Sequence, residues 1–384
     1  MPRIHPSTAK PAAGQGTVTL DDLGDLRLVV GSGDEMSKFI VCSRSLSRSS
    51  PVFKAMLYGS FRESRPADPS ANPWVVELPD DLATPAAILL GIIHGRFSMV
   101  DPKVGTLDGL YQILAFADKY DMVSLLAPWI QGWVEDVSPL QGPRPLDTTW
   151  TIWKAIAVSR QIGALRPMRE LVRRIVMTAE SNSNGELLFE GSLLQPPGSH
   201  EMPLSSPETT IWVSKHHRWI LYRILNMLRA LVLDLRTAIN SNGGDGAICC
   251  VLYLQDLDPG SEASQCHSAT LGFILSAMDE EEVKVLWAPD ASSDLPPQYP
   301  WAPDASPDLP AQYPFSVQHL VEKIKSISAN VSNSARHGPG CNPLPPMIKY
   351  IDDFIDVCSC RLPDDMVASL ERQRTRYGEL DGFC

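Results

Sequence analysis

The residues best suited to hold a metal ion are cysteines and histidines in the second half of the chain. Of the eight cysteines, Cys42 stands alone and the other seven lie beyond residue 248. Structural zinc takes four thiolate or imidazole ligands in a tetrahedron, usually from two close pairs. The candidate ligands on this pattern are Cys250, Cys266, His337 and Cys341. No C-x2-C pair occurs and free cysteines are often buried for packing alone, so buried thiols without a cofactor are the competing interpretation.

Catalytic signatures are absent from the sequence. It contains no G-x-x-x-x-G-K-[ST], H-E-x-x-H, G-x-S-x-G or G-x-G-x-x-G segment. The acidic runs at residues 279–282 and 352–353 fall at expected helix ends or faces, where solvation and the helix dipole account for them. We therefore expect no enzyme, although a triad that is assembled only in space would leave no such pattern.

Length, charge and hydropathy limit the class of protein. A chain of 384 residues predicts two or three domains, and a net charge of −12 disfavours binding to a phosphate backbone. The longest apolar run, Pro85 to Ile93, is too short to span a bilayer. The first residues lack the apolar core of a secretory signal, so we expect reduced cysteines and a cytoplasmic or nuclear location. Neither nucleic acid nor membrane is expected as a partner.

In the first part of the chain, strands precede helices. Residues 1–22 are rich in Pro, Ala, Gly and Ser, which predicts a disordered lead-in. Alternating apolar residues predict strands at 26–30, 38–42 and 74–78. Helical spacing follows at 43–58, with a second start at Pro51, and then at 84–94, 106–120 and 122–137. This order predicts an α+β domain.

Helices dominate beyond residue 137. Two are predicted at 148–162 and 165–180, and the polar, Pro-rich residues 181–209 indicate a linker. Residues 210–384 are predicted to be mostly helical, with one helix of nearly thirty residues at 211–239. The basic side chains of that helix could bind a partner acid, but solvation alone explains most such surfaces.

A tandem repeat occupies residues 287–314. The segment WAPDASSDLPPQYP is followed at once by WAPDASPDLPAQYP. The density of proline predicts an exposed, turn-rich or polyproline-like loop. The repeat is either a recent duplication in a tolerant loop or a peptide ligand for an aromatic groove.

Residues 23–137 resemble a BTB/POZ domain, in the version found in fungal proteins of unassigned role. Ser50-Pro51-Val52-Phe53-Lys54-Ala55-Met56-Leu57 is similar to the family's S-x-V-F-x-x-M-L helix, and Leu114 to Met122 to its L-x-x-A-D-K-Y-x-M helix. The first three strands also match in order. The helices at 146–180 stand where a BACK-like extension often follows. The predicted core is Leu28, Val30, Ile40, Phe53, Met56, Val76, Ile88, Leu114 and Leu125.

The resemblance implies a protein-interaction module, and further a substrate adaptor that bridges a cullin-type ubiquitin ligase to a client. The residues it assigns to the cullin-binding face are Leu78, Asp80, Asp81, Leu110, Tyr111, Asp121 and Met122, with Met122 as an apolar anchor. A nuclear, transcription-associated scaffold or corepressor is the alternative. A zinc-binding C-terminal domain is a further one.

The sequence departs from the family at the pocket that would lie at the base of a dimer. Cys42 and Ser43 stand where a histidine and a basic residue usually accompany the opening aspartate, here Asp25. An unpaired buried carboxylate is costly. Asp25 is then partly solvated, or Arg44 substitutes, or dimerisation through this surface is lost. We predict a monomer or weak homodimer, which Ser43→Arg would tighten.

Overall fold

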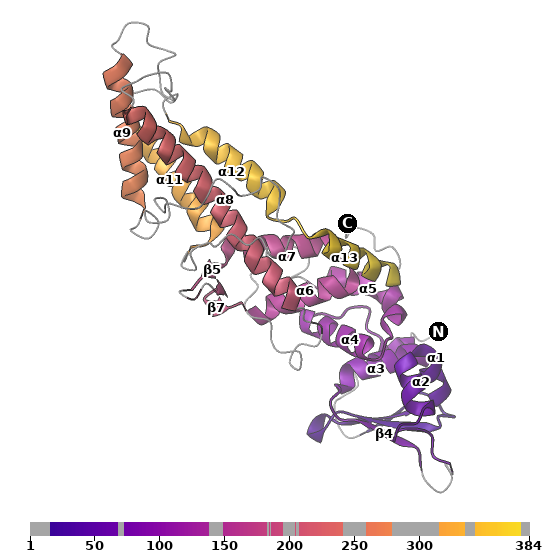
Figure 1. The fold of residues 1–384 in the computed structure, drawn as a ribbon. Coiled ribbons are helices and arrows are strands. Elements are labelled where there is room, and N and C mark those ends of the chain that lie inside the picture. Colours follow the sequence, from indigo (N-terminus) through magenta and orange to yellow (C-terminus); the bar gives the residue numbers. More distant parts are fainter. Residues whose placement is uncertain are drawn as a thin grey trace, which may run out of the picture. The chain divides into compact units, whose positions relative to one another are not determined.

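The computed structural model describes residues 16–67, 73–137, 149–182, 184, 186–194, 204, 207–240, 259–278, 315–334 and 342–377. The architecture is α+β, with a small sheet and many helices (Figure 1). The chain divides into two compact units. Unit 1 comprises residues 1–168, 197–205 and 364–384, and unit 2 comprises residues 169–196 and 206–363. The tandem repeat at 287–314 lies outside the described residues.

Unit 1 is built on a four-stranded mixed sheet in the order β1-β3-β2-β4. The hairpin of β2 (Leu26–Val30) and β3 (Ser37–Val41) is antiparallel, whereas β1 (Thr17–Thr19) and β4 (Val75–Leu78) run parallel to their neighbours. The three predicted strands are confirmed. The disordered lead-in is wrong for residues 17–19, because a strand of three residues is too short to show alternation.

The register of the hairpin decides which side chains are buried. Leu28 faces Phe39 across the hairpin, and both are at most 2% exposed. Ile40 pairs with Arg27 on the opposite face and is only half-buried. The prediction that Ile40 belongs to the core is therefore wrong, since neighbouring residues of a strand point to opposite faces. Met56, Ile88 and Leu125 of the predicted core are likewise only half-buried.

Helices cover the buried face of this sheet and extend unit 1 beyond it (Figure 1). Those of the first part are α1 (Ser43–Ser49), α2 (Pro51–Tyr58), α3 (Ala83–Ile93), α4 (Leu107–Lys119) and α5 (Ala127–Asp136). Short 3-10 turns occur at η1 (Gly33–Glu35), η2 (Phe97–Met99) and η3 (Val123–Leu126). The predicted helices over residues 43–137 are thus confirmed, with a break at Pro51.

Unit 1 also contains two helices that the sequence assigned to other regions. Helix α6 (Thr149–Ile162) packs on α4, and α13 (Asp364–Arg376) packs on α6. Between them, Gly163 has a φ of +70° and comes so close to α13 that a Cβ there would lie 2.3 Å from the carbonyl oxygen of Leu370. The C-terminal helix is therefore part of unit 1. The sequence pattern had placed it in the separate helical region of residues 210–384.

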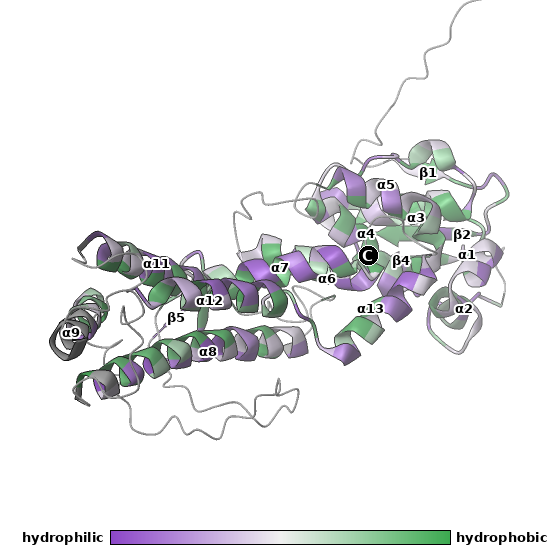
Figure 2. Ribbon diagram, turned by 90° about the horizontal axis from the view of Figure 1, so that it is seen from above, coloured by the Kyte–Doolittle hydropathy of each residue, from purple (hydrophilic) through white to green (hydrophobic). Residues whose placement is uncertain are grey.

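Unit 2 is a set of long helices with a small sheet. The four helices α8 (Pro207–Asn240), α9 (Pro259–Ala277), α11 (Val317–Ser334) and α12 (Leu344–Cys358) pack together, and α7 (Leu165–Thr178) begins in unit 1 and continues here. Hydrophobic and hydrophilic residues alternate along α8 (Figure 2), as its predicted helical spacing requires. None of the described helices is long and apolar enough to cross a membrane.

The segment predicted as a linker contains most of the small sheet of unit 2. Its strands are β5 (Glu180–Ser181), β6 (Leu187–Phe189) and β7 (Ser192–Leu193), in antiparallel order. Strands of two or three residues give no periodic pattern, so the sequence missed them. Helix α9 was also missed, because its Ser, Ala and Gly residues have weak helical spacing of apolar positions.

Candidate functional site

A buried hydrogen-bond network in unit 1 joins the loop after β4 to the end of α4. Asp81 is 8% exposed, and the Nζ of Lys119 lies 2.8 Å from each of its carboxylate oxygens. The hydroxyl of Tyr120 donates to Oδ2 of Asp81 at 2.6 Å. Burial and the neighbouring Asp81 carboxylate raise the pKa of Tyr120, so it remains a protonated donor. Asp81 therefore holds the two loops side by side.

Ser50 connects the two sequence motifs of the predicted domain. Its side chain caps α2 by accepting the N–H of Phe53 at 2.9 Å, with Pro51 at the first helical position. Its hydroxyl donates to the carbonyl oxygen of Tyr120 at 2.5 Å. The ring of Phe53 stacks on that of Tyr120 with centroids 4.4 Å apart. The S-P-V-F and A-D-K-Y segments thus pack directly on each other.

The residues predicted to form the cullin-binding face divide into buried and exposed groups. Leu78, Leu110, Tyr111 and Met122 are at most 7% exposed, and Asp81 is buried in the network above. Asp80 and Asp121 are exposed. Met122 is 0% exposed, so it cannot be the surface anchor that the sequence suggested. The helical spacing that marked these apolar residues is the spacing of a core face.

An exposed leucine, which the sequence did not single out, stands among these residues. Leu82, at the start of α3, is 45% exposed. Asp80 precedes it, and the Asp81 network brings the end of α4, with Lys119 and Asp121, to the same place. We call Asp80, Leu82, Lys119 and Asp121 the 80–121 surface. The sequence held a weak indication that Leu82 is exposed, because it precedes the start of a helix and is not one of the regularly spaced apolar residues of that helix.

Asp25 is better compensated than the sequence indicated. The backbone N–H of Ser43 donates to Oδ1 of Asp25 at 2.8 Å, and the hydroxyl of Ser43 donates to Oδ2 at 2.7 Å. Asp25 is exposed, whereas Ser43 is fully buried. Of the three alternatives, partial solvation fits, and Ser43 rather than Arg44 supplies the partner. The expectation that Ser43→Arg would tighten a dimer is withdrawn, since arginine does not fit a buried serine site.

Cys42, the other unusual residue of this pocket, is held through its backbone. Its N–H donates to Nε2 of His94 at 3.0 Å, and Nδ1 of His94 lies 2.8 Å from the carbonyl oxygen of Leu90. Since Nε2 accepts and Nδ1 must donate, His94 is the neutral Nδ1–H tautomer. The thiol of Cys42 is free and half-buried.

Three of the four zinc candidates lie outside the described residues. These are Cys250, His337 and Cys341, while Cys266 falls within α9 with its side chain not described. In the parts of the chain that the structure describes, no group of three His, Cys, Asp or Glu side chains could hold a metal ion. Burial raises the pKa of the free thiol of Cys358, which was not among the candidates. The zinc site remains a prediction.

Two buried histidines lie near the start of α8 in unit 2. The ring of His216 stacks between Trp212 and Trp219, and its Nε2 donates to the carbonyl oxygen of Cys358 at 3.0 Å. Nδ1 of His217 lies 2.8 Å from the carbonyl oxygen of Val176. Burial lowers the pKa of each histidine to about 4. Both are neutral near pH 7 and fasten α8 to α7 and to the end of α12.

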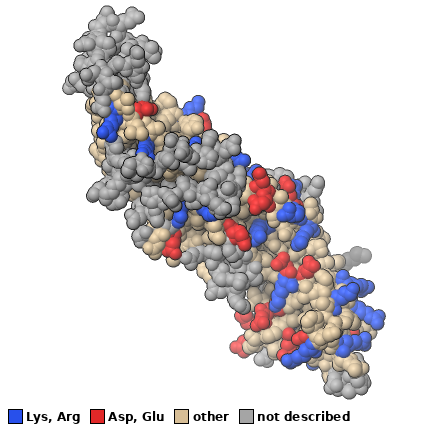
Figure 3. Space-filling model, in the orientation of Figure 1, with Lys and Arg blue, Asp and Glu red and all other residues tan. Residues whose placement is uncertain are grey.

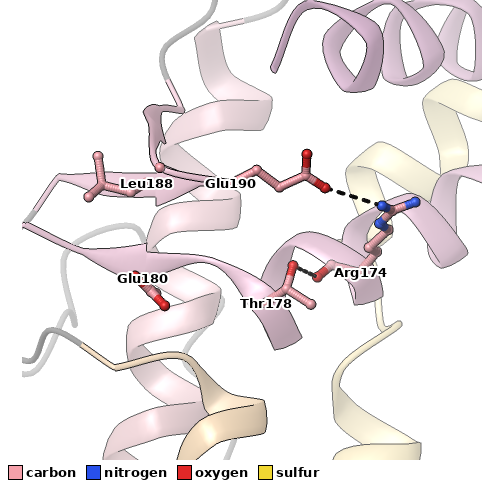
Figure 4. A pocket seen from close by; sticks show the side chains of 6 residues that line it. Arg174, Thr178, Glu180, Leu188 and Glu190 are labelled. Carbon is pink, nitrogen blue, oxygen red and sulfur yellow. Dashed lines mark hydrogen bonds and ion pairs between the residues drawn. The ribbon is translucent and has the colours of Figure 1, made fainter. Parts of the chain in front are cut away.

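A shallow pocket in unit 2 lies between the end of α7 and the small sheet (Figure 4). The guanidinium of Arg174 lies 3.4 Å from the carboxylate of Glu190 across it, and the hydroxyl of Thr178 donates to the carbonyl oxygen of Arg174. Glu180, Leu188 and Gly191 complete the lining. The positive charge of Arg174 is paired with Glu190 inside the pocket. The lining residues include no nucleophile next to a base, so a structural role is favoured.

The 80–121 surface is thus the best-defined candidate contact among the residues that the sequence pointed to. It has an exposed apolar side chain between charges, on loops fixed by a buried network. Comparisons of the chain with protein-family models, with curated proteins and with solved structures found no match.

Proposed function

We propose that unit 1 is a protein-interaction domain of the BTB/POZ type, and that its 80–121 surface binds a cullin-type subunit of a ubiquitin ligase. Two features support the proposal. The order of hairpin, paired short helices, third strand and further helices is the order that the sequence resemblance implies. The two most specific motifs of that resemblance also contact each other through Ser50, Phe53 and Tyr120.

The observation that carries the proposal is the clamp that Asp81 makes with Lys119 and Tyr120. A partner gains most from surface that is already ordered, because binding then costs little conformational entropy. Leu82 supplies an apolar anchor on these fixed loops. Asp80 and Asp121 flank it at the rim, where charges govern the rate of association and the choice of partner more than the affinity.

The test is co-precipitation of a cullin with the full-length protein. We expect Leu82→Asp to abolish capture, because it places an unpaired charge at the centre of the contact. Asp34→Lys, at an exposed position of η1, changes charge elsewhere in unit 1 and should leave capture intact. Circular dichroism of both variants verifies folding. If the intact protein captures no cullin, the adaptor function is refuted and a scaffold for other proteins remains.

A further inference from the structure

A positively charged face lies over α1, α2 and the turn that follows them. Residues 43–66 contain five basic residues, Arg44, Arg48, Lys54, Arg62 and Arg65, against the single acid Glu63. The segment thus carries a formal charge of +4 in a chain whose net charge is −12. Figure 3 shows Lys and Arg side chains gathered over α1 and α2. We call the five basic residues, with Val52, Tyr58 and Phe61, the basic face.

The cations of the basic face form no ion pair with the described residues. All five are exposed, and in the part of the chain that the structure describes none of them takes part in an ion pair. Other cations of unit 1 do: Lys119 pairs with Asp81, Lys154 with Asp108 and Lys103 with Asp136. An unbalanced cluster raises the local potential and attracts an anionic group to this face.

Exposed apolar side chains occur in the same segment as these cations. Val52, Tyr58 and Phe61 are 38%, 43% and 60% exposed. The hydroxyl of Tyr58 is 2.6 Å from Oγ of Ser43, and its ring meets the ring of Trp74 edge-on. Trp74 in turn donates to the carbonyl oxygen of Glu63 at 2.9 Å, so the turn after α2 is also tied down. Fixed aromatic side chains together with arginine are the residue types enriched at the centres of protein interfaces.

We propose that the basic face binds an acidic segment of a partner protein, in which Asp or Glu residues alternate with leucine or aromatic residues. The carboxylates would neutralise the unpaired cations while the apolar residues cover Tyr58 and Phe61. This is a second contact, made by different residues from those of the 80–121 surface, and it does not depend on the proposed cullin binding.

Charge also argues against the other occupants. In a twofold dimer formed through this face the same patch meets itself, so a charge of +4 would oppose a charge of +4. A long nucleic acid would meet the remainder of the chain, whose formal charge is −16 once the +4 segment is taken from −12. A short acidic peptide avoids both penalties.

The test measures fluorescence anisotropy of a labelled synthetic peptide in which Glu alternates with Leu and Phe, titrated with the full-length protein. We expect binding that weakens as salt is raised, because exposed charges are screened. The double variant Arg44→Glu with Arg48→Glu should weaken binding by about tenfold or more, which is about 1.4 kcal/mol. Phe61→Ser should also weaken it, and its exposed position keeps folding intact.

The matched control is Arg166→Glu with Arg169→Glu, which makes the same charge change at two exposed positions of α7. If the control variant loses as much peptide affinity as Arg44→Glu with Arg48→Glu, binding depends on net charge alone and the proposal is overturned. So would equally tight binding of polyuridylate RNA, of phosphatidylserine vesicles, or of the chain's own peptide 287–300. Leu82→Asp should leave peptide binding unchanged, which separates this result from the outcome of the cullin experiment.

Discussion

Tyr120 shows how a single residue supports a surface that it does not itself form. It is 3% exposed, yet its hydroxyl, ring and carbonyl oxygen contact Asp81, Phe53 and Ser50 respectively. The 80–121 surface depends on it indirectly, because the loops that carry Asp80, Leu82 and Asp121 meet at this residue. Its role is therefore one of positioning.

Tyr120→Phe tests the buried hydroxyl. The variant leaves Oδ2 of the buried Asp81 without its tyrosine donor, so we expect a loss of about 1–3 kcal/mol in the free energy of unfolding. Tyr58→Phe removes a hydroxyl that lies 2.6 Å from Oγ of Ser43, but that Oγ keeps its hydrogen bond to Asp25, so the loss should be under about 1 kcal/mol. Urea denaturation of both variants provides the comparison. Equal losses would mean that Asp81 is satisfied without Tyr120.

Phe53→Ala tests the packing of the two motifs. Phe53 is fully buried and stacks on Tyr120, so its removal should cost about 3–5 kcal/mol in the free energy of unfolding. Val52→Ala, its 38% exposed neighbour on α2, serves as the control for helix propensity and should have a small effect. A change under about 1 kcal/mol for Phe53→Ala would show that the stacked pair contributes little.

The buried histidines of α8 predict a pH dependence of stability. His216 and His217 have pKa values lowered to about 4 by burial, against about 6.5 in the unfolded chain. Below pH 6.5 the unfolded state binds more protons, so their stabilising contribution is complete above that pH and is lost as pH falls toward 4. We expect a loss of about 2 kcal/mol per histidine at pH 5 relative to neutral pH.

Urea denaturation at pH 7 and pH 5 measures this loss. The variant His217→Asn should reduce the difference between the two pH values, whatever its effect on stability at pH 7. His319→Asn, at an exposed position of α11, should leave the difference unchanged. If the difference in stability between pH 7 and pH 5 is unchanged in His217→Asn, other groups are responsible for it.

The sequence predicted the helices and strands whose apolar pattern extends over several residues. Strands β2, β3 and β4 and most of the helices were foreseen because their buried residues recur at regular spacing. Strands β1, β5, β6 and β7 contain two or three residues each and were missed. Their pairing is decided by neighbouring strands and not by a pattern of their own.

Substitution of Gly163 tests how closely α13 packs against the rest of unit 1. A Cβ at this position would lie 2.3 Å from the carbonyl oxygen of Leu370 and 2.5 Å from the backbone nitrogen of Arg374, so Gly163→Ala must displace α13. Gly95 has nearly the same positive φ, +68°, but open space around its Cβ position. Gly95→Ala therefore carries only the backbone strain, about 1–2 kcal/mol.

We expect Gly163→Ala to lower the melting temperature more than Gly95→Ala does. Hydrogen exchange in α13 should accelerate only in the Gly163 variant, because only there does the substituted residue meet that helix. If the two variants behave alike, the close approach between Gly163 and α13 does not contribute to stability.

For the whole molecule, sequence reasoning found two of the four residues of the 80–121 surface and could not say which predicted residues are exposed. Asp80 and Asp121 were named and lie at the surface, whereas Leu110 and Met122 were named and are buried. Helical spacing identifies a buried face without saying whether the protein core or a partner covers it. The exposure of Leu82 and of the cations of residues 43–66 depends on tertiary packing, which no local sequence pattern shows.

The charge of the basic face leads to a prediction about the oligomeric state. A twofold dimer through α1 and α2 would juxtapose two faces of charge +4. Like charges across an interface oppose association, and salt reduces the opposition. We therefore expect a monomer or weak dimer at micromolar concentration in low salt, with association increasing as salt is raised or when Arg44 and Arg48 are both changed to Glu. Sedimentation velocity measures both effects. A dimer that persists at nanomolar concentration in low salt, unchanged in the double variant, would show that assembly uses a different surface.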